Sequence, residues 1–171
     1  MMLAPSLAAI LVRELTTLRM EIEAYPYDAD LWRIVPGISN SGGTLALHLV
    51  GNLQHFIGKV LGRSAYVRNR DAEFATRDLS RAELVGKITA AIAAVQRTLG
   101  GLSPEQLEAP YPEPVAKVRL STGDFLIHLA SHLSYHLGQL DYHRRIVTGG
   151  AALSGALSPT RLWSAEPESS A

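Results

Sequence analysis

Three histidines spaced four residues apart are the side chains in this sequence best suited to chemistry. His128, His132 and His136 lie in a window whose other regularly spaced residues are Phe and Leu. In an α-helix, side chains four positions apart lie on one face and about 6 Å apart along the axis, so two imidazoles can converge on one metal ion. His132 belongs to both possible pairs, and the spacing alone leaves the choice of pair open.

A second group of histidines, His48 and His55, lies on an apolar stripe earlier in the chain. Catalytic divalent-metal sites commonly have three protein ligands and at least one open position. Helical bundles build such sites from facing helices, so His48 or His55 is expected to supply the third ligand. Because the chain has no cysteine, the ligands must be nitrogen or oxygen atoms.

The competing interpretation is that these histidines are ordinary hydrogen-bonded residues of the core or its boundary. It suits His143, which precedes Arg144 and Arg145 at an end of its helix expected to be solvated. This interpretation suits the histidines of residues 128–136 less well, because each buried imidazole without a hydrogen-bond partner would lower the stability of the fold. One metal ion would remove that cost for several imidazoles at once. Metal binding is the favoured interpretation of this run.

Neighbouring polar side chains are candidates to accept hydrogen bonds from the second nitrogens of metal-bound imidazoles. The candidates close in sequence are Asn52, Gln54, Tyr135, Gln139 and Asp141. The pattern does not choose among them.

Four segments with a helical period must position the histidines. They cover residues 7–22, 41–61, 80–99 and 121–147. Ser80 with Glu83 and Ser121 with Asp124 predict capping boxes at the starts of the third and fourth helices.

The four segments predict an all-α fold, a four-helix bundle with long crossover loops. The connections between the helices span residues 26–40, 63–78 and 103–121. A single helical-bundle domain is expected over residues 1–158. The polar, proline-containing residues 159–171 are expected to form a flexible C-terminal tail.

Charge and hydropathy narrow the classes of partner. The 171 residues include 16 basic and 16 acidic side chains, so no field of one sign would attract nucleic acid. No apolar run approaches the roughly 20 residues of a transmembrane helix, and membrane association is not expected. The apolar residues 1–12 lack the basic leader and cleavage site of a signal peptide. A cytoplasmic location is therefore the expectation.

Two windows of this sequence resemble a known family. Residues 128–145, HLASHLSYHLGQLDYHRR, resemble the last helix of the DinB-like superfamily of bacterial four-helix metalloproteins. Residues 45–58, LALHLVGNLQHFIG, are similar to the second helix of that family. The order of helices also agrees, so that the resemblance extends to about Val147 and implies the same bundle.

The resemblance selects among the histidines. The metal ligands of the family, one histidine of the second helix and an HxxxH pair of the last, correspond to His48, His132 and His136. His55 and His128 become neighbours of the site, with a lower expectation of joining it. The implied cofactor is a divalent metal, with Zn or Ni expected first and Fe or Mn as alternatives.

The resemblance also implies a class of reaction. Relatives include thiol transferases that use bacillithiol and the mycothiol-dependent maleylpyruvate isomerase, in which the metal activates the sulfur of a low-molecular-weight thiol. A metal-dependent thiol S-transferase or a hydrolase is therefore implied, acting on a small-molecule substrate as a homodimer. The alternative is a non-catalytic, metal-stabilised dimeric bundle that serves as a binding or stress-related module, with His55 or His128 completing a closed set of four ligands.

Overall fold

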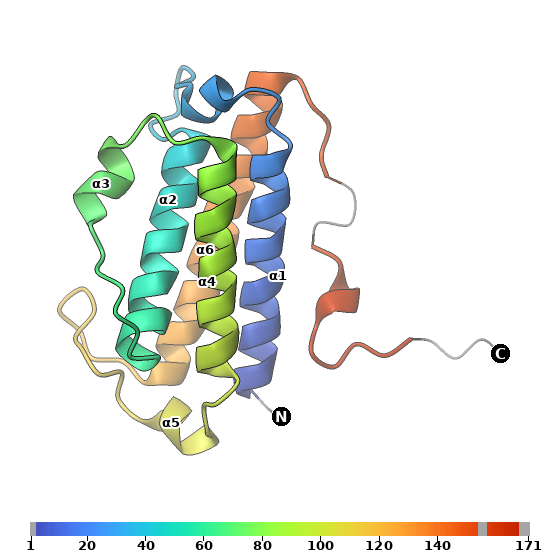
Figure 1. Ribbon diagram of the computed structural model, residues 1–171. Helices are drawn as coiled ribbons and strands as arrows, with labels where there is room; N and C mark the ends of the chain where they lie inside the picture. Colours follow the sequence, from blue (N-terminus) through green and yellow to red (C-terminus); the bar gives the residue numbers. More distant parts are fainter. Residues whose placement is uncertain (1–2, 154–156, 168–171) are drawn as a thin grey trace.

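Long helices lie side by side in the computed structural model, which describes residues 3–153 and 157–167 (Figure 1). The long elements are α1 (Leu3–Glu23), α2 (Gly42–Leu53) with its continuation η2 (Gln54–Leu61), α4 (Arg81–Leu99) and α6 (Thr122–Thr148). The short elements are η1 (Asp28–Trp32), α3 (Arg70–Ala75), α5 (Pro104–Glu108) and η3 (Pro159–Arg161). The described residues form no strand, and the all-α prediction is confirmed.

The core lies between the long helices. Helix α1 packs mainly against α4 and α6, while α2 packs against α3, α4 and α6. The predicted apolar stripe of α1 is buried throughout, at Leu7, Leu11, Leu15, Leu18 and Ile22. Each such side chain contributes about 1.5–3 kcal/mol on burial. This apolar packing sets the relation of α2 to α6, the two helices that carry most of the histidines.

Serine caps fix where the long helices begin. Ser80 and Glu83 form the predicted reciprocal capping box at the start of α4. Ser121 accepts a hydrogen bond from the backbone N–H of Asp124 at the start of α6. Ser41 does the same for α2. Each cap satisfies a backbone donor that the helix itself leaves without a partner.

The second helix changes its hydrogen-bonding pattern midway. It is α-helical to Leu53 and becomes a π-helix over η2. A π-helix closes its hydrogen bonds over five residues instead of four, so side chains beyond Leu53 depart from the α-helical periodicity. His55 lies at the start of this segment, so its side chain does not follow the α-helical spacing from His48.

The prediction that His143 lies at a solvated helix end was wrong, because its side chain is fully buried. Its Nε2–H donates to the Arg33 carbonyl oxygen at 2.8 Å, so Nδ1 accepts from the Tyr25 hydroxyl at 2.7 Å. The first residue of α2, Gly42, makes room for this contact, since a Cβ there would lie 2.2 Å from the Tyr25 oxygen. His143 is thus a hydrogen-bonded core residue.

Acidification is expected to weaken the fold through His143. Burial lowers the pKa of His143 below its ordinary value, although the hydrogen bond to the Arg33 carbonyl oxygen opposes this shift. The unfolded chain therefore takes up a proton near pH 6.5 that the folded chain does not, and the free energy of unfolding falls as the pH drops below that value. Urea unfolding of metal-free protein at pH 7.5, 6.5 and 5.5 measures this slope. His143→Gln, whose amide does not titrate, should show a smaller slope, and an equal slope would contradict the assignment.

The segment after α6 returns along the outside of α1 (Figure 1). It contains η3 but is otherwise without regular structure in its described residues. The division into a domain ending at residue 158 and a tail over 159–171 stays a prediction, and residues 168–171 of that tail lie outside the described residues. Within the described part of the chain, no helix has both the length and the apolar character needed to cross a membrane.

Candidate metal centre

The helices bring the three predicted ligands together. His48 projects from α2, and His132 and His136 project from successive turns of α6. The Nε2 atoms of His48 and His132 lie 3.4 Å apart. The ring centroid of His136 lies 5.4 Å from that of His48 and 4.6 Å from that of His132. One nitrogen from each ring falls within 4.8 Å of the other two, so the three histidines could hold a metal ion.

The spacing of the ring nitrogens fits shared coordination. Histidine nitrogens bind zinc at about 2.0–2.1 Å, which places two nitrogens of a tetrahedral site about 3.3 Å apart. The separation of 3.4 Å between His48 and His132 is close to that value. A single cation would satisfy both lone pairs.

His132 is held in the form that a metal requires. Burial, together with the neighbouring His136, His48 and His128, lowers its pKa to about 4. Its imidazole is therefore neutral at pH 7, and only a neutral imidazole has a free lone pair for a metal.

Behind His48 lies an acidic residue that the sequence analysis missed. Glu73, on the short helix α3, has its Oε2 atom 3.1 Å from His48 Nδ1. Arg68 donates to both oxygens of this carboxylate, at 2.7 and 2.9 Å. Burial opposes ionisation of Glu73, but the hydrogen bonds from Arg68 and His48 outweigh it and hold the pKa of the carboxyl below its usual value.

The local sequence does indicate the short helix α3 that carries Glu73. Asn69 caps α3 by accepting a hydrogen bond from the Ala72 backbone N–H. Asp71 and Glu73 stand in the first turn, where acidic side chains suit the helix dipole. The pattern indicates a short helix, but nothing local indicates that this helix docks against α2.

Of the predicted set of acceptors, Gln139 forms a hydrogen bond with a histidine of the triad. Its Oε1 lies 2.7 Å from His136 Nδ1 and accepts the N–H of that ring. This bond leaves Nε2 of His136 as the nitrogen with a lone pair toward the other two rings.

Neither of the two alternative histidines joins the triad. His55 Nε2 is 3.1 Å from the Glu113 carboxylate in the connection before α6. His128 is exposed, and its ring stacks on Phe125 with centroids 6.0 Å apart. Among the described residues, the group of acidic and histidine side chains close enough to share an ion is the triad alone.

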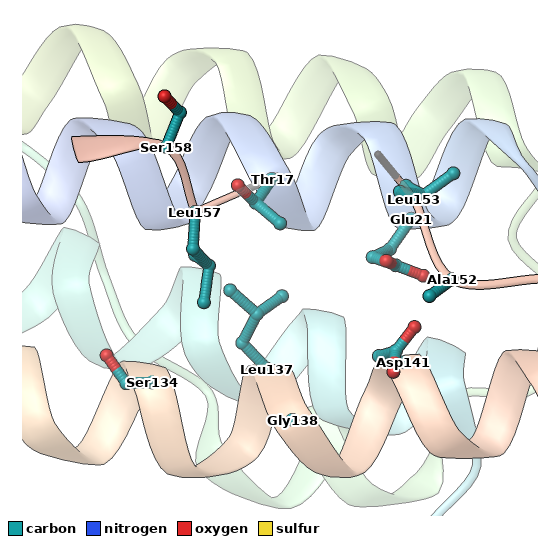
Figure 2. Close-up of a pocket in the computed structure, with 10 residues that line it drawn as sticks. All are labelled: Thr17, Glu21, Ser134, Leu137, Gly138, Asp141, Ala152, Leu153, Leu157 and Ser158. Atoms are coloured by element: carbon teal, nitrogen blue, oxygen red, sulfur yellow. The ribbon is translucent and has the colours of Figure 1, made fainter. Parts of the chain in front are cut away.

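The largest cavity among those described lies away from the triad. It has a volume of about 560 Å³ and lies between α1, α6 and the C-terminal segment (Figure 2). Figure 2 shows Glu21 and Asp141 extending toward one another across it. Arg144 donates to both carboxylates and Arg145 also donates to Asp141, so two arginine charges match the two acidic charges of this cavity within the protein.

A second cavity, of about 450 Å³, has none of the three histidines in its walls. Its walls include Leu45, three residues before His48, and Gln139, three residues after His136. Both positions are one helical turn from a histidine of the triad, so the cavity offers room for a small molecule near the histidines.

An α-helical bundle whose facing helices present three histidines to one point defines a candidate metalloprotein. The family model of the DinB superfamily matches residues 10–140, which includes α2, α4 and the two histidines that α6 contributes to the triad. The chain belongs to the DinB superfamily. Comparisons with curated proteins and with solved structures gave no match.

Proposed function

We propose that this protein is a divalent-metal-dependent enzyme, with His48, His132 and His136 as its metal ligands. The reaction proposed is transfer of a low-molecular-weight thiol to an electrophilic small molecule, with hydrolysis as the related alternative. When bound, a divalent metal in such a site lowers the pKa of a thiol or water at an open position and makes it a nucleophile at neutral pH.

The observation that carries the proposal is that one nitrogen of each of the three histidines lies within 4.8 Å of the other two, and that no other acidic or histidine side chain of the described residues joins this group. Structural zinc sites have four closed ligands, and His55 and His128 are engaged elsewhere. This arrangement favours chemistry over the non-catalytic, metal-stabilised module. Zn or Ni suits three imidazoles, with Fe or Mn as alternatives.

The residues of the chain have separate parts in this proposal. Glu73 and Gln139 orient His48 and His136 through hydrogen bonds. The cavity bordered by Leu45 and Gln139 would receive the small-molecule substrate. A cytoplasmic location, a homodimer, and the absence of nucleic-acid and membrane partners stay predictions.

The proposal predicts metal-dependent turnover. Protein purified without an affinity tag should carry about one equivalent of metal per chain by elemental analysis. With a bacterial low-molecular-weight thiol and an electrophilic acceptor, it should form the thioether or substitution product, lose this activity with a chelator and regain it on adding metal. Protein with bound metal but no metal-dependent turnover on thiol or hydrolysable substrates would support the non-catalytic module instead.

A further inference from the structure

The connection between η2 and α4 reaches across α2 to the side of His48 that faces away from the other two ligands. In Figure 1, α3 stands on the outer side of α2 within this connection. The Glu73 side chain is buried, and it receives hydrogen bonds from His48 on one side and from Arg68 on the other. A buried carboxylate bonded on both sides has little freedom to move.

A glycine on α2 leaves the space that this carboxylate occupies. A Cβ at Gly51 would lie 2.0 Å from Glu73 Oε1 and 2.7 Å from its Cδ. Gly51 is one turn after His48 and has ordinary helical geometry, so its role is to leave space. Glycine at this helical position costs about 1 kcal/mol relative to alanine, a cost that the close approach of Glu73 explains.

We infer that Glu73, clamped by Arg68 and admitted by Gly51, is a positioning residue that sets the metal affinity of the triad through His48. The inference rests on the proposed metal centre. It adds that the connection of residues 63–78, which carries Arg68 and Glu73, controls the metal affinity of that centre. Glu73 contacts no substrate and no metal in this assignment. It acts by fixing which nitrogen of His48 carries the proton.

The hydrogen-bond geometry gives the direction of the effect. A carboxylate that already accepts two N–H groups from Arg68 can only accept from His48, so Nδ1 of His48 carries the proton. Nε2 is then left with its lone pair toward His132 and His136. A histidine in the other tautomer would present an N–H at the place of the metal and would have to rearrange before binding.

Glu73→Gln is the first test. The amide has one acceptor oxygen for Arg68 and His48 together, and its NH₂ group favours the Nε2–H tautomer of His48. Zinc affinity, measured by competition with a chromophoric chelator, should fall by about 10–100-fold. The matched control is Glu113→Gln, which alters a carboxylate at the same 3.1 Å distance from a histidine outside the triad and should leave the zinc affinity unchanged.

Gly51→Ala tests the same inference without altering a polar group. The new methyl group must displace the Glu73 carboxylate, so zinc affinity should again fall about tenfold or more. Gly86→Ala is the control, because a Cβ at that position on α4 meets nothing within 4 Å. Thermal unfolding of the metal-free Gly51→Ala and Gly86→Ala proteins tests whether each variant remains folded.

Nitrogen-15 NMR of the histidine rings in metal-free protein separates this inference from the proposed function. Wild-type His48 should be the Nδ1–H tautomer, and Glu73→Gln should shift it toward Nε2–H. Equal zinc affinity of wild type and both variants, or a wild-type His48 in the Nε2–H form, would overturn the inference while leaving the metal centre intact. Failure of the wild type to bind zinc would overturn the metal centre, whatever the tautomer.

Discussion

Replacing His132 by alanine is expected to abolish stoichiometric metal binding. His132 supplies one of the three nitrogens proposed to bind the metal, and its ring lies 5.2 Å from that of His48 and 4.6 Å from that of His136, centroid to centroid. Its removal leaves two nitrogens from different helices, and the loss should exceed the about 10–100-fold weakening typical when a supporting residue around a metal is lost. Elemental analysis of untagged protein at neutral pH, followed by chelator competition, measures the change.

The control for this variant is His128→Ala, one turn earlier on the same helix. His128 is exposed and lies outside the triad, so this variant should keep about one equivalent of metal. A His132→Ala protein that retained its full metal content would contradict the assignment of the site. Loss of metal in both variants would instead place His128 among the ligands.

Replacing Arg144 by leucine is expected to be the most destabilising change of a charged residue. Arg144 is buried and bonded to the buried carboxylate of Glu21, to Asp141 and to the carbonyl oxygen of Ala151. Removing one partner of a buried ion pair leaves the other charge without compensation, which costs about 3–5 kcal/mol. Urea denaturation at pH 7 gives the free energy of unfolding.

The defect of Arg144→Leu should become smaller in acid. Burial raises the pKa of Glu21 above its ordinary value even with Arg144 present, and without the arginine the pKa rises further. A carboxyl whose pKa is higher in the folded than in the unfolded state gains folded stability as the pH falls through the folded-state pKa toward the unfolded-state pKa. The difference from wild type should therefore shrink between pH 7 and pH 5.

The adjacent Arg145 provides the matched control for Arg144→Leu. Its side chain is 38% exposed and reaches Asp141 at 3.4 Å, so Arg145→Leu should change stability by less than about 1 kcal/mol. Replacing Glu21 and Arg144 together by leucine should recover much of the loss. Equal effects of the two single arginine changes would show that the buried pair contributes nothing particular.

The long helices could be predicted because their signals are local. The period of the apolar residues in α1 and the capping box of Ser80 with Glu83 lie within short windows of sequence. Such signals determine where a helix forms and which face it buries. The π-helical segment η2 gave no comparable signal, since α-helical periodicity extends over it in the sequence, so the departure of His55 from the face of His48 could not be predicted.

The histidines of the candidate site could be predicted because their spacing is visible within single helices. The residues that depend on how α3 packs against α2 could not be predicted. The spacing placed His128, His132 and His136 on one helix face with His48 or His55 opposite, and the family resemblance selected His48, His132 and His136. Glu73 could not be found, because its contact with His48 spans 25 residues and depends on the space at Gly51. A charged connection gives no sign of which of its acids will be buried.

The same limit explains the error at His143. From the sequence, a histidine followed by two arginines indicates a solvated helix end. The structure instead buries His143 against Tyr25 and Arg33, which approach from an earlier part of the chain. Polar residues near helix ends are thus poor guides to burial when a long connection folds back over them.

The separation of His48 from His132 along the chain has a consequence for folding. Their nitrogens face each other although the two residues are 84 positions apart in the sequence. A shared ion would close a loop of that length, and a covalent cross-link over such a loop removes chain entropy worth about 4–5 kcal/mol from the unfolded state. The three histidines meet only after α2 and α6 have packed together, so the ion would form a reversible cross-link late in folding. Such a cross-link would slow unfolding, while the early steps of folding would depend on the apolar faces of the helices.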